Sequence, residues 1–222
     1  MSNEMNMTID EARALVSDAA LWPRVRDFLW DFAPQVHSSW LEDMGHGPLD
    51  SPRVKRFILS SLGIEPCFHT FPKDDWSRIV LLDGADLESL VKWLGSISCA
   101  DRLRRVTDGK AVRELKTALP GVYPEVFGYT AYFERDSRDV KDGADGGCTA
   151  DHVVSLGFSL ITSMFDGVPE SVVARFKFKL PREMASVSSA DSLPPGSPKG
   201  REAAVAKLLK LKFPEAHSLC CS

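Results

Sequence analysis

The fold is best predicted from the stretch Val153-Val154-Ser155-Leu156-Gly157-Phe158-Ser159-Leu160-Ile161-Thr162-Ser163-Met164-Phe165, which leaves little polar surface. A surface helix shows one apolar stripe, whereas a helix that is apolar on most of its sides is buried. Thr149, just before the stretch, can cap its first turn. Gly157 and the small serines would let a neighbouring helix approach closely. The pattern predicts a mainly α-helical fold whose core is built around this buried helix.

Shorter helices are expected on the N-terminal side of this stretch, where apolar residues recur at helical spacing. The apolar stripe within 22–32 is interpreted as core, and Phe57 is counted among the apolar residues of a short helix that follows Ser51 and Pro52. The expected helices span 12–19 (after a capping box at 8–11), 23–34, 52–62, 76–82, 87–94 and, in two pieces broken at Asp108-Gly109, 99–119.

A two-residue alternation follows the central helix, in Val173-Ala174-Arg175-Phe176-Lys177-Phe178-Lys179-Leu180. Alternating apolar and charged residues are typical of a half-buried strand, so at most a small β element is expected near residues 173–180. A lone strand cannot satisfy its backbone hydrogen bonds. Either residues 129–133 pair with this segment or it lies at a sheet edge.

The C-terminal part divides into a spacer and a basic helix. Residues 182–200 are rich in Ser, Pro and Gly, and residues 201–213 form a basic amphipathic pattern that Pro214 ends. This final helix could dock on the core or reach outward. We therefore expect a single helical core domain at 1–181, a mobile spacer at 182–200, and a basic amphipathic C-terminal helix with its tail at 201–222. Cys220 and Cys221 are interpreted as part of an exposed tail.

The composition is that of an ordinary globular protein. The 222 residues are 44% hydrophobic and 26% charged, with a formal net charge of -4, which argues against a protein whose whole surface meets nucleic acid. The five cysteines are widely spaced and include no C-x-x-C pair, so neither a zinc site nor a secreted disulfide framework is expected, and a reducing cytoplasm fits better. A polar, acidic start and the lack of any run of roughly 18 apolar residues indicate a protein that neither crosses a membrane nor carries a secretory signal.

The motifs that would indicate catalysis are incomplete. The glycine-rich run at 142–147 lacks the lysine of a phosphate loop and is interpreted as part of a mobile loop at 136–147. Ser159 lacks the second glycine of a nucleophile elbow, and only Cys67 and His69 are close enough in sequence to suggest metal ligands. We therefore expect no enzymatic activity, no catalytic residue, no metal and no cofactor.

Two basic segments remain as candidate binding surfaces. Arg102, Arg104, Arg105 and Arg113 could bind nucleic acid or an acidic protein, or could form a solvated face offset by nearby acidic residues. Lys207, Lys210 and Lys212 suggest an anionic membrane surface, a partner groove or a plain docked helix. Exposed aromatic and arginine side chains are common anchors of protein interfaces. The candidate partner-binding residues are Trp40, Arg102, Arg104, Arg105, Lys207 and Lys210.

Taken in order, these parts resemble the SctK/YscK family, the accessory cytoplasmic component of the type III secretion sorting platform. The resemblance lies in the layout of most of the chain. It rests on an N-terminal apolar helix ending at Pro34, helices around 76–81 and 87–91, the long apolar helix, the segment Arg175-Phe176-Lys177-Phe178-Lys179-Leu180-Pro181, and Ala206-Lys207-Leu208-Leu209-Lys210 before Pro214. The loop at 136–147 and the spacer at 182–200 look expanded relative to that family.

The resemblance implies a mainly helical, non-enzymatic adaptor at the cytoplasmic face of the inner membrane, peripheral to the membrane rather than inserted. Its expected partners are the SctQ-type pod protein and the cytoplasmic domain of the SctD-type inner-membrane ring protein, with the stator and the ATPase as further platform components and no nucleic acid. The alternative is a helical nucleic-acid-binding or regulatory protein that uses the basic region Arg102–Lys116. An enzyme ranks third, because it would need a site that the sequence does not reveal.

Overall fold

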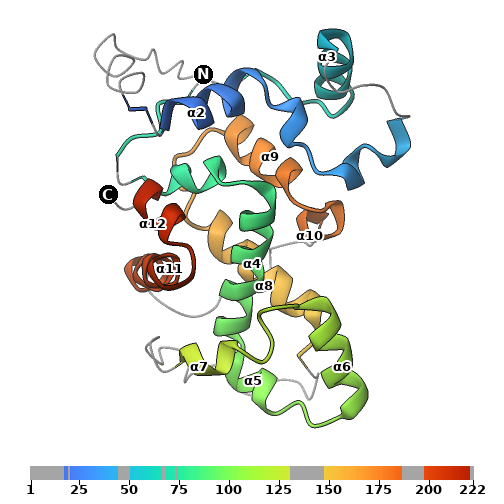
Figure 1. Cartoon of the computed structure of the whole chain (residues 1–222), viewed down its shortest axis with the longest axis vertical. Helices are drawn as coiled ribbons and strands as arrows, with labels where there is room; N and C mark the ends of the chain where they lie inside the picture. Colours follow the sequence, from blue (N-terminus) through green and yellow to red (C-terminus); the bar gives the residue numbers. More distant parts are fainter. Residues whose placement is uncertain are drawn as a thin grey trace. The chain divides into compact units, whose positions relative to one another are not determined.

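The chain is mainly helical, as the sequence predicts. The computed structural model describes residues 18–19, 21–44, 51–66, 69–73, 75–130, 148–186 and 198–220, and every regular element in these ranges is an α-helix or a 3-10 helix (Figure 1). The capping box at 8–11, the loop at 136–147 and most of the spacer at 182–200 lie outside the described residues. The chain divides into two compact units, which are described separately below. The predicted boundaries after residues 181 and 200 remain predictions.

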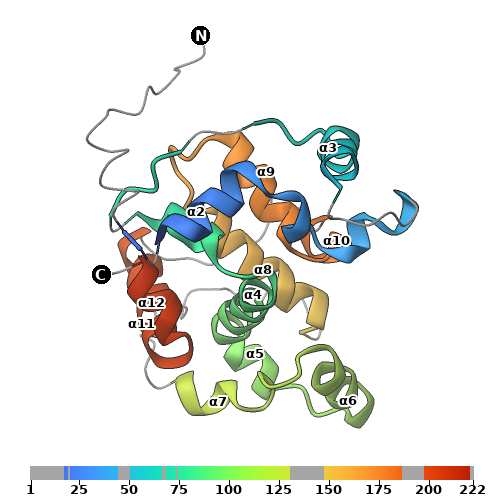
Figure 2. The same ribbon diagram turned by 45° about the horizontal axis from the view of Figure 1, so that its top comes forward.

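Unit 1 comprises Met1–Leu87, Phe165–Arg182 and Pro214–Ser222. Its helices include α2, which lies beside α9 in two views of the molecule (Figures 1 and 2). The elements of this unit are α2 (Leu21–Trp30), η1 (Ala33–Gln35), η2 (Ser38–Trp40), η3 (Glu42–Met44), α3 (Pro52–Ser61), η4 (Trp76–Leu81), α9 (Glu170–Lys179) and α12 (Pro214–Cys220).

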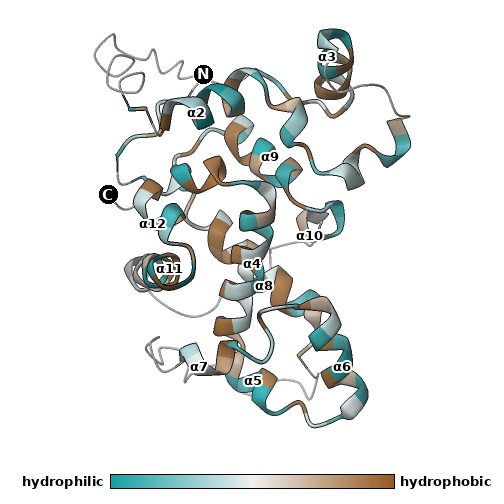
Figure 3. Cartoon of the chain, viewed as in Figure 1, coloured by the Kyte–Doolittle hydropathy of each residue, from teal (hydrophilic) through white to brown (hydrophobic). Residues whose placement is uncertain are grey.

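Unit 2 comprises Glu88–Met164 and Glu183–Phe213. It holds most of α4 (Gly84–Ser98) and all of α5 (Ala100–Arg104), α6 (Gly109–Ala118), α7 (Val126–Tyr129), α8 (Ala150–Thr162) and α11 (Pro198–Lys212). The helix α10 (Arg182–Ser186) begins at the last residue of one unit 1 segment. Hydrophobic residues follow α4 and α8 along much of their length (Figure 3).

The predicted buried helix is α8, and its start and surroundings match the prediction. The Thr149 hydroxyl accepts the backbone N–H of His152 at 3.2 Å and so caps the helix. Eight of its residues are buried: Val153, Ser155, Leu156, Gly157, Phe158, Ser159, Leu160 and Ile161. The helix ends at Thr162 rather than continuing to Phe165.

Two glycines set how closely α4 and α8 approach. A methyl group placed on Gly157 would lie 1.9 Å from the carbonyl oxygen of Val91, and one placed on Gly95 would lie 1.8 Å from the carbonyl oxygen of Val153. Real side-chain carbons do not approach backbone oxygens this closely, so only glycine fits at either position. Because Val91 faces Gly157 while Gly95 faces Val153, the two helices run antiparallel in a fixed register.

A single methyl group at this crossing should separate the helices. We expect Gly157→Ala to lower the free energy of unfolding by about 2–4 kcal/mol, because the added carbon meets backbone that cannot rotate away. The control is Gly109→Ala at the first position of α6, where nothing lies within 4 Å; that change should be neutral or slightly stabilising. Urea unfolding followed by circular dichroism measures both, and equal stabilities of the two variants would refute the close crossing.

The strand prediction at 173–180 is wrong, because this segment forms α9. The buried residues of α9 are Val172, Arg175, Phe176 and Lys179, which recur at helical spacing. Two of these buried residues are basic, and the pattern resembles an alternation only if both are assumed to face solvent. In its expected partner segment, Tyr129 is the last residue of α7, and residues 131–133 lie outside the described ranges.

Arg175 and Lys179 are buried because they bind the carbonyl ends of two other helices. Arg175, 2% exposed, donates to the carbonyl oxygens of Phe28 and Leu29 in the last turn of α2, and to that of Glu65 at 3.0 Å. Lys179, 3% exposed, donates to the carbonyl oxygens of Val80 and Leu82 at the end of η4. The last carbonyls of a helix have no partner within it and carry partial negative charge. The two cations therefore connect α9 to both helix ends.

Burial of Lys179 makes stability depend on pH. Its pKa is lowered to about 7, chiefly because burial disfavours the charged amine; the Asp83 carboxylate opposes this shift and the Arg24 guanidinium adds to it. A lysine in the unfolded chain keeps a pKa of 10.5. Between these two values the unfolded chain binds a proton that the folded chain lacks, so this contribution to stability rises with pH and is lost as the pH falls towards 7.

We expect Lys179→Met to remove that pH dependence. The difference in unfolding free energy between the wild type and this variant should grow between pH 7 and pH 10, by at most about 1.4 kcal/mol per pH unit. Lys177→Met is the matched control, because Lys177 is exposed on the same helix; its curve should run parallel to that of the wild type. Urea unfolding at a series of pH values checks this, and parallel curves for all three proteins would contradict it.

The remaining elements show smaller differences from prediction. The helix expected at 76–82 is the 3-10 helix η4, and the stripe of α2 is buried at Val25, Phe28 and Leu29 as expected. A further helix, α12, follows Pro214, where a tail was expected. Cys220 is buried in it, which corrects the prediction of an exposed tail, while Cys221 lies outside the described residues. Arg78 accounts for part of this order, since it donates to the carbonyl oxygen of Leu219 at 3.1 Å.

Candidate partner-binding surface

Three of the predicted partner-binding arginines lie on or beside α5 in unit 2. Arg102 and Arg104 belong to the last turn of α5, and Arg105 is its C-terminal cap residue. All three side chains are exposed. Basic residues are favoured at a helix C-terminus, where the unpaired carbonyls are partly negative. The position at the end of α5 therefore explains why basic residues occur there, but it does not explain how their side chains are oriented.

Arg104 is held in place by three neighbours. Its guanidinium pairs with the Asp101 carboxylate at 3.1 Å, lies 5.5 Å from the centre of the Phe127 ring and donates to the hydroxyl of Thr130. Asp101 precedes it by one turn, while Phe127 belongs to α7 and Thr130 caps the end of that helix. An arginine restrained in this way loses less side-chain entropy when it binds a partner.

Arg102 is restrained by a histidine. Its Nη1 lies 2.9 Å from Nε2 of His152, which belongs to α8. A guanidinium has only donors, so the histidine nitrogen must accept, which requires a neutral ring. The His152 pKa is accordingly lowered, first by burial and then by the positive charge of Arg102. This contact orients Arg102 over the start of α8.

The basic surface continues along α6. Lys110, Arg113 and Lys116 are exposed on this helix. A shallow depression of about 410 Å³ lies on it, lined by Lys110, Arg113, Glu114, Thr117 and Ala118. The six basic residues of the region 102–116 are therefore all exposed in unit 2. We call Arg102, Arg104, Arg105, Lys110, Arg113 and Lys116 the α5–α6 basic surface.

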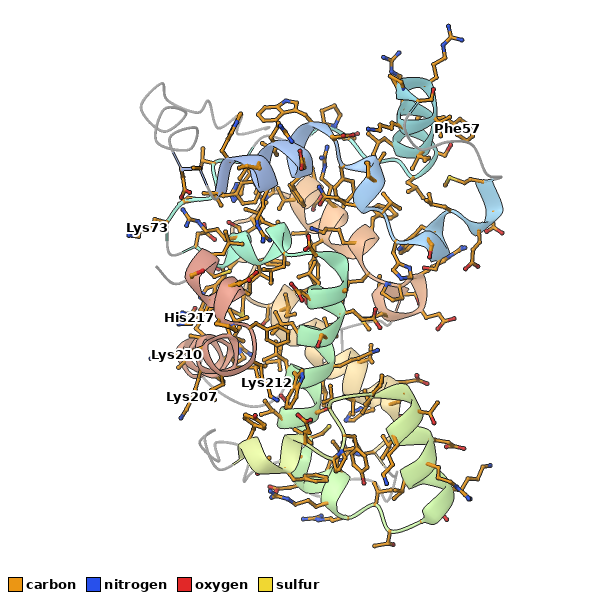
Figure 4. All side chains as sticks on the ribbon, viewed as in Figure 1. Phe57, Lys73, Lys207, Lys210, Lys212 and His217 are labelled. Atoms are coloured by element: carbon orange, nitrogen blue, oxygen red, sulfur yellow. The ribbon has the colours of Figure 1, made fainter. Side chains whose placement is uncertain are left out.

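The basic C-terminal helix is docked through its apolar face, which answers a question that the sequence left open. Val205, Leu208 and Leu209 of α11 are buried, whereas Lys207 and Lys210 are exposed. Figure 4 shows Lys207 and Lys210 pointing outward from α11. These two predicted residues are therefore accessible to a partner. Leu211 of the same helix is 43% exposed.

Lys212 anchors the end of α11. Its Nζ lies 4.4 Å from the ring centres of both Trp93 and Tyr129, and 3.0 Å from a carboxylate oxygen of Glu125. Partial burial acts to lower the Lys212 pKa, but hydrogen bonds to Tyr129 and Glu125 outweigh it and leave the pKa raised. The two rings come from α4 and α7, so one lysine joins three helices of unit 2.

Trp40, the sixth predicted residue, lies in unit 1 and binds within its own unit. Its indole N–H donates to the carbonyl oxygen of Leu180 at 2.9 Å, and its ring packs edge-on against Phe178 at 4.8 Å between centres. The guanidinium of Arg182 lies 5.7 Å from the centre of the Trp40 ring. The side chain is half-buried, so one part of it is occupied by the fold and another part remains accessible.

Sequence reasoning missed two exposed aromatic side chains in unit 1. Phe57, which it counted among the apolar residues of α3, is 58% exposed, and Trp30 at the end of α2 is 55% exposed. Ile58 is the buried residue of α3. The helical spacing could have predicted this exposure, because Phe57 lies one turn after Arg53 and next to Arg56, on the charged side of the helix. Figure 4 shows Phe57 at the periphery of α3.

His69, Ser77 and Asp75 lie close together in unit 1 but serve the fold rather than forming a reactive arrangement. His69 Nε2 lies 2.9 Å from the Ser77 hydroxyl, and Asp75 is nearby, which resembles a hydrolase triad. However, the Asp75 carboxylate accepts the backbone N–H of Ser77 at 2.7 Å and so caps η4, and Ser77 is fully buried. Burial lowers the His69 pKa, and the Asp75 charge opposes this shift. The trio is therefore a structural cap.

In the ranges that the structure describes, His, Cys, Asp and Glu side chains form no group of three or more that could hold a metal ion. Within the same ranges, no helix is both long and apolar enough to cross a membrane.

Comparisons with known proteins identify no relative. No family model, no curated protein and no solved structure matches the chain.

The anchoring role of Lys212 can be tested by stability. Lys212→Ala removes one ion pair and two ring contacts, so we expect it to lower the unfolding free energy by about 1–2 kcal/mol. Lys210→Ala is the control on the exposed face of the same helix and should change stability by less than about 0.5 kcal/mol. Urea unfolding measures both, and an equal effect of the two changes would show that Lys212 does not hold α11.

Proposed function

We propose that this protein is a non-enzymatic adaptor of the type III secretion sorting platform, similar to the SctK/YscK proteins. It would link the cytoplasmic domain of the SctD-type inner-membrane ring protein to the SctQ-type pod protein, at the cytoplasmic face of the inner membrane. The stator and the ATPase of the platform are further candidate partners. The proposal combines the sequence resemblance with the mainly helical fold.

The α5–α6 basic surface is the observation that carries the proposal. An adaptor works by burying matched surfaces, and a standard interface covers roughly 800 Å² on each partner. Arginines that are already oriented make good anchors, because little entropy is lost when they pair with a carboxylate. Arg102 and Arg104 have such orientation through His152, Asp101 and Phe127. An acidic surface on a partner protein would complement them.

The proposed complex is tested by co-purification. The full-length protein is mixed with a SctQ-type pod protein and a SctD-type cytoplasmic domain from the same organism, and the mixture is analysed by size-exclusion chromatography with light scattering. A co-eluting complex of defined mass supports the adaptor function. A lone monomer in the presence of either partner would contradict it.

Charge reversal then tests the surface. We expect Arg104→Glu combined with Arg105→Glu to weaken binding to the acidic partner at least about tenfold, because two attractive pairs become repulsive. Arg53→Glu with Arg56→Glu is the matched control: both residues are exposed on α3 in unit 1, and the net charge changes by the same amount. Isothermal titration calorimetry measures both. Binding that is unchanged by the first pair, or equally weakened by the second, would exclude the α5–α6 surface.

A nucleic-acid-binding or regulatory function is the second candidate. It is favoured by the exposure of all six basic residues of the α5–α6 basic surface. Nucleic-acid binding of this kind weakens steeply as salt rises, because bound counterions are released from the phosphates. Fluorescence anisotropy with a labelled duplex at several salt concentrations distinguishes the two functions. The acidic residues Asp101 and Glu114 beside the arginines favour the protein partner instead.

A further inference from the structure

Two cysteines meet where α4 and α8 come together in unit 2. Cys99 follows the last residue of α4 and begins α5, and Cys148 lies just before Thr149, the cap of α8. Both are free thiols and both are buried. They are 49 positions apart in the sequence, so the fold must bring them together.

The register of the glycine crossing places them side by side. Gly95 faces Val153, and the helices are antiparallel, so one turn further along α4 the residue Cys99 faces the start of α8. A second contact links the same two helix ends, since Arg102 of α5, three residues after Cys99, lies within hydrogen-bonding distance of His152 in the first turn of α8. The two thiols are close enough for each to shift the pKa of the other, that of Cys99 upward and that of Cys148 downward.

The surroundings make the two thiols unequal. The Cys99 sulfur also lies 3.0 Å from the carbonyl oxygen of Gly95, so its proton can be donated either to that oxygen or to Cys148. The hydrogen bond to Cys148 and burial raise the Cys99 pKa. The hydrogen bond from Cys99 lowers the Cys148 pKa, and the positive charge of Arg102 lowers it further against the effect of burial. Cys148 is therefore the better thiolate and Cys99 its proton donor.

We propose that Cys99 and Cys148 form a redox-active dithiol, in which hydrogen peroxide or a related small peroxide converts the pair to an intramolecular disulfide. This site is independent of the proposed adaptor function. Nothing in an adaptor requires two buried cysteines side by side, and a low-pKa thiol next to a second, resolving thiol is a common redox-sensing arrangement.

The reaction balances in two steps. The Cys148 thiolate attacks one oxygen of the peroxide, the O–O bond breaks, and Cys148 becomes a sulfenic acid while hydroxide leaves. The Cys99 sulfur then attacks the Cys148 sulfur, the S–O bond breaks, and the thiol proton and the departing hydroxyl leave as water. Both cysteines are oxidised to one disulfide, and one peroxide is reduced to two molecules of water once the hydroxide takes up a proton.

The test uses the full-length protein treated with hydrogen peroxide under native conditions. Free thiols are then alkylated, and the disulfides are mapped by peptide mass spectrometry without reduction. We expect one major cross-link, Cys99 to Cys148, that dithiothreitol removes, although the chain has five cysteines. The oxidised protein should also unfold at a higher temperature, by roughly 5–10 °C, because the bond closes a long loop in the unfolded chain. The absence of this cross-link, or a mixture of pairings, would overturn the proposal.

Single serine variants separate the two roles. In Cys99→Ser the sulfenic acid of Cys148 has no partner, so it should accumulate and be labelled by dimedone. In Cys148→Ser the peroxide should label Cys99 much less than it labels Cys148 in the other variant, because burial still raises the Cys99 pKa. Serine preserves the size and hydrogen-bonding ability of the side chain, and circular dichroism checks that each variant folds. Equal dimedone labelling of Cys99 and Cys148 in the two variants would refute the assignment of Cys148 as nucleophile.

Discussion

The close crossing of α4 and α8 at Gly95 and Gly157 is the constraint on which most of unit 2 depends. Backbone meets backbone there, so the helices can neither slide nor rotate without a clash. Because the register is fixed, the residues beyond the crossing are fixed as well. Cys99, one turn beyond Gly95, comes to the start of α8 beside Cys148. The proximity of the candidate redox pair therefore depends on the absence of two side chains.

Unit 1 is joined by a different kind of interaction, in which a helix supplies cations to the ends of other helices. Arg175 binds the last turn of α2 and Lys179 binds the end of η4. Unpaired carbonyls at a helix end are costly to bury, and a buried cation without partners is costlier still. Each side chain donates hydrogen bonds to the carbonyl oxygens, and the carbonyl oxygens satisfy the buried side chain. Replacing Arg175 or Lys179 by an apolar residue would therefore leave buried carbonyl oxygens without a donor. The phenylalanine rings of α2 and its neighbour complete the site, since Phe28 and Phe32 lie within 5.7 Å of the Arg175 guanidinium.

These two interactions explain what the sequence could and could not predict. The buried helix, its cap at Thr149 and the close approach at Gly157 were all predictable, because they depend on residues near in sequence and on side-chain size. The helix at 170–179 was not predictable, because the rule that basic residues face solvent fails when distant carbonyl oxygens accept their hydrogen bonds. The prediction for Phe57 was wrong in the opposite sense: its hydrophobicity suggested a buried side chain, but its position in the helix places it among arginines and leaves it exposed. The pairing of Cys99 with Cys148 needed the register of two helices, which no local pattern encodes.

The residues of the α5–α6 basic surface could be identified from the sequence, whereas the contacts that restrain two of its arginine side chains are seen only in the structure. A cluster of arginines alone predicts weak, salt-sensitive binding to any acidic surface. Restraint by His152, Asp101 and Phe127 changes this, because the side chains present their donors in fixed directions and lose little entropy on binding. Fixed donors favour a partner whose carboxylates match them in position, which is a requirement of shape as well as charge. Under the proposed adaptor function, the fixed directions of Arg102 and Arg104 would favour the selective recognition of one protein over the tracking of a flexible polyanion.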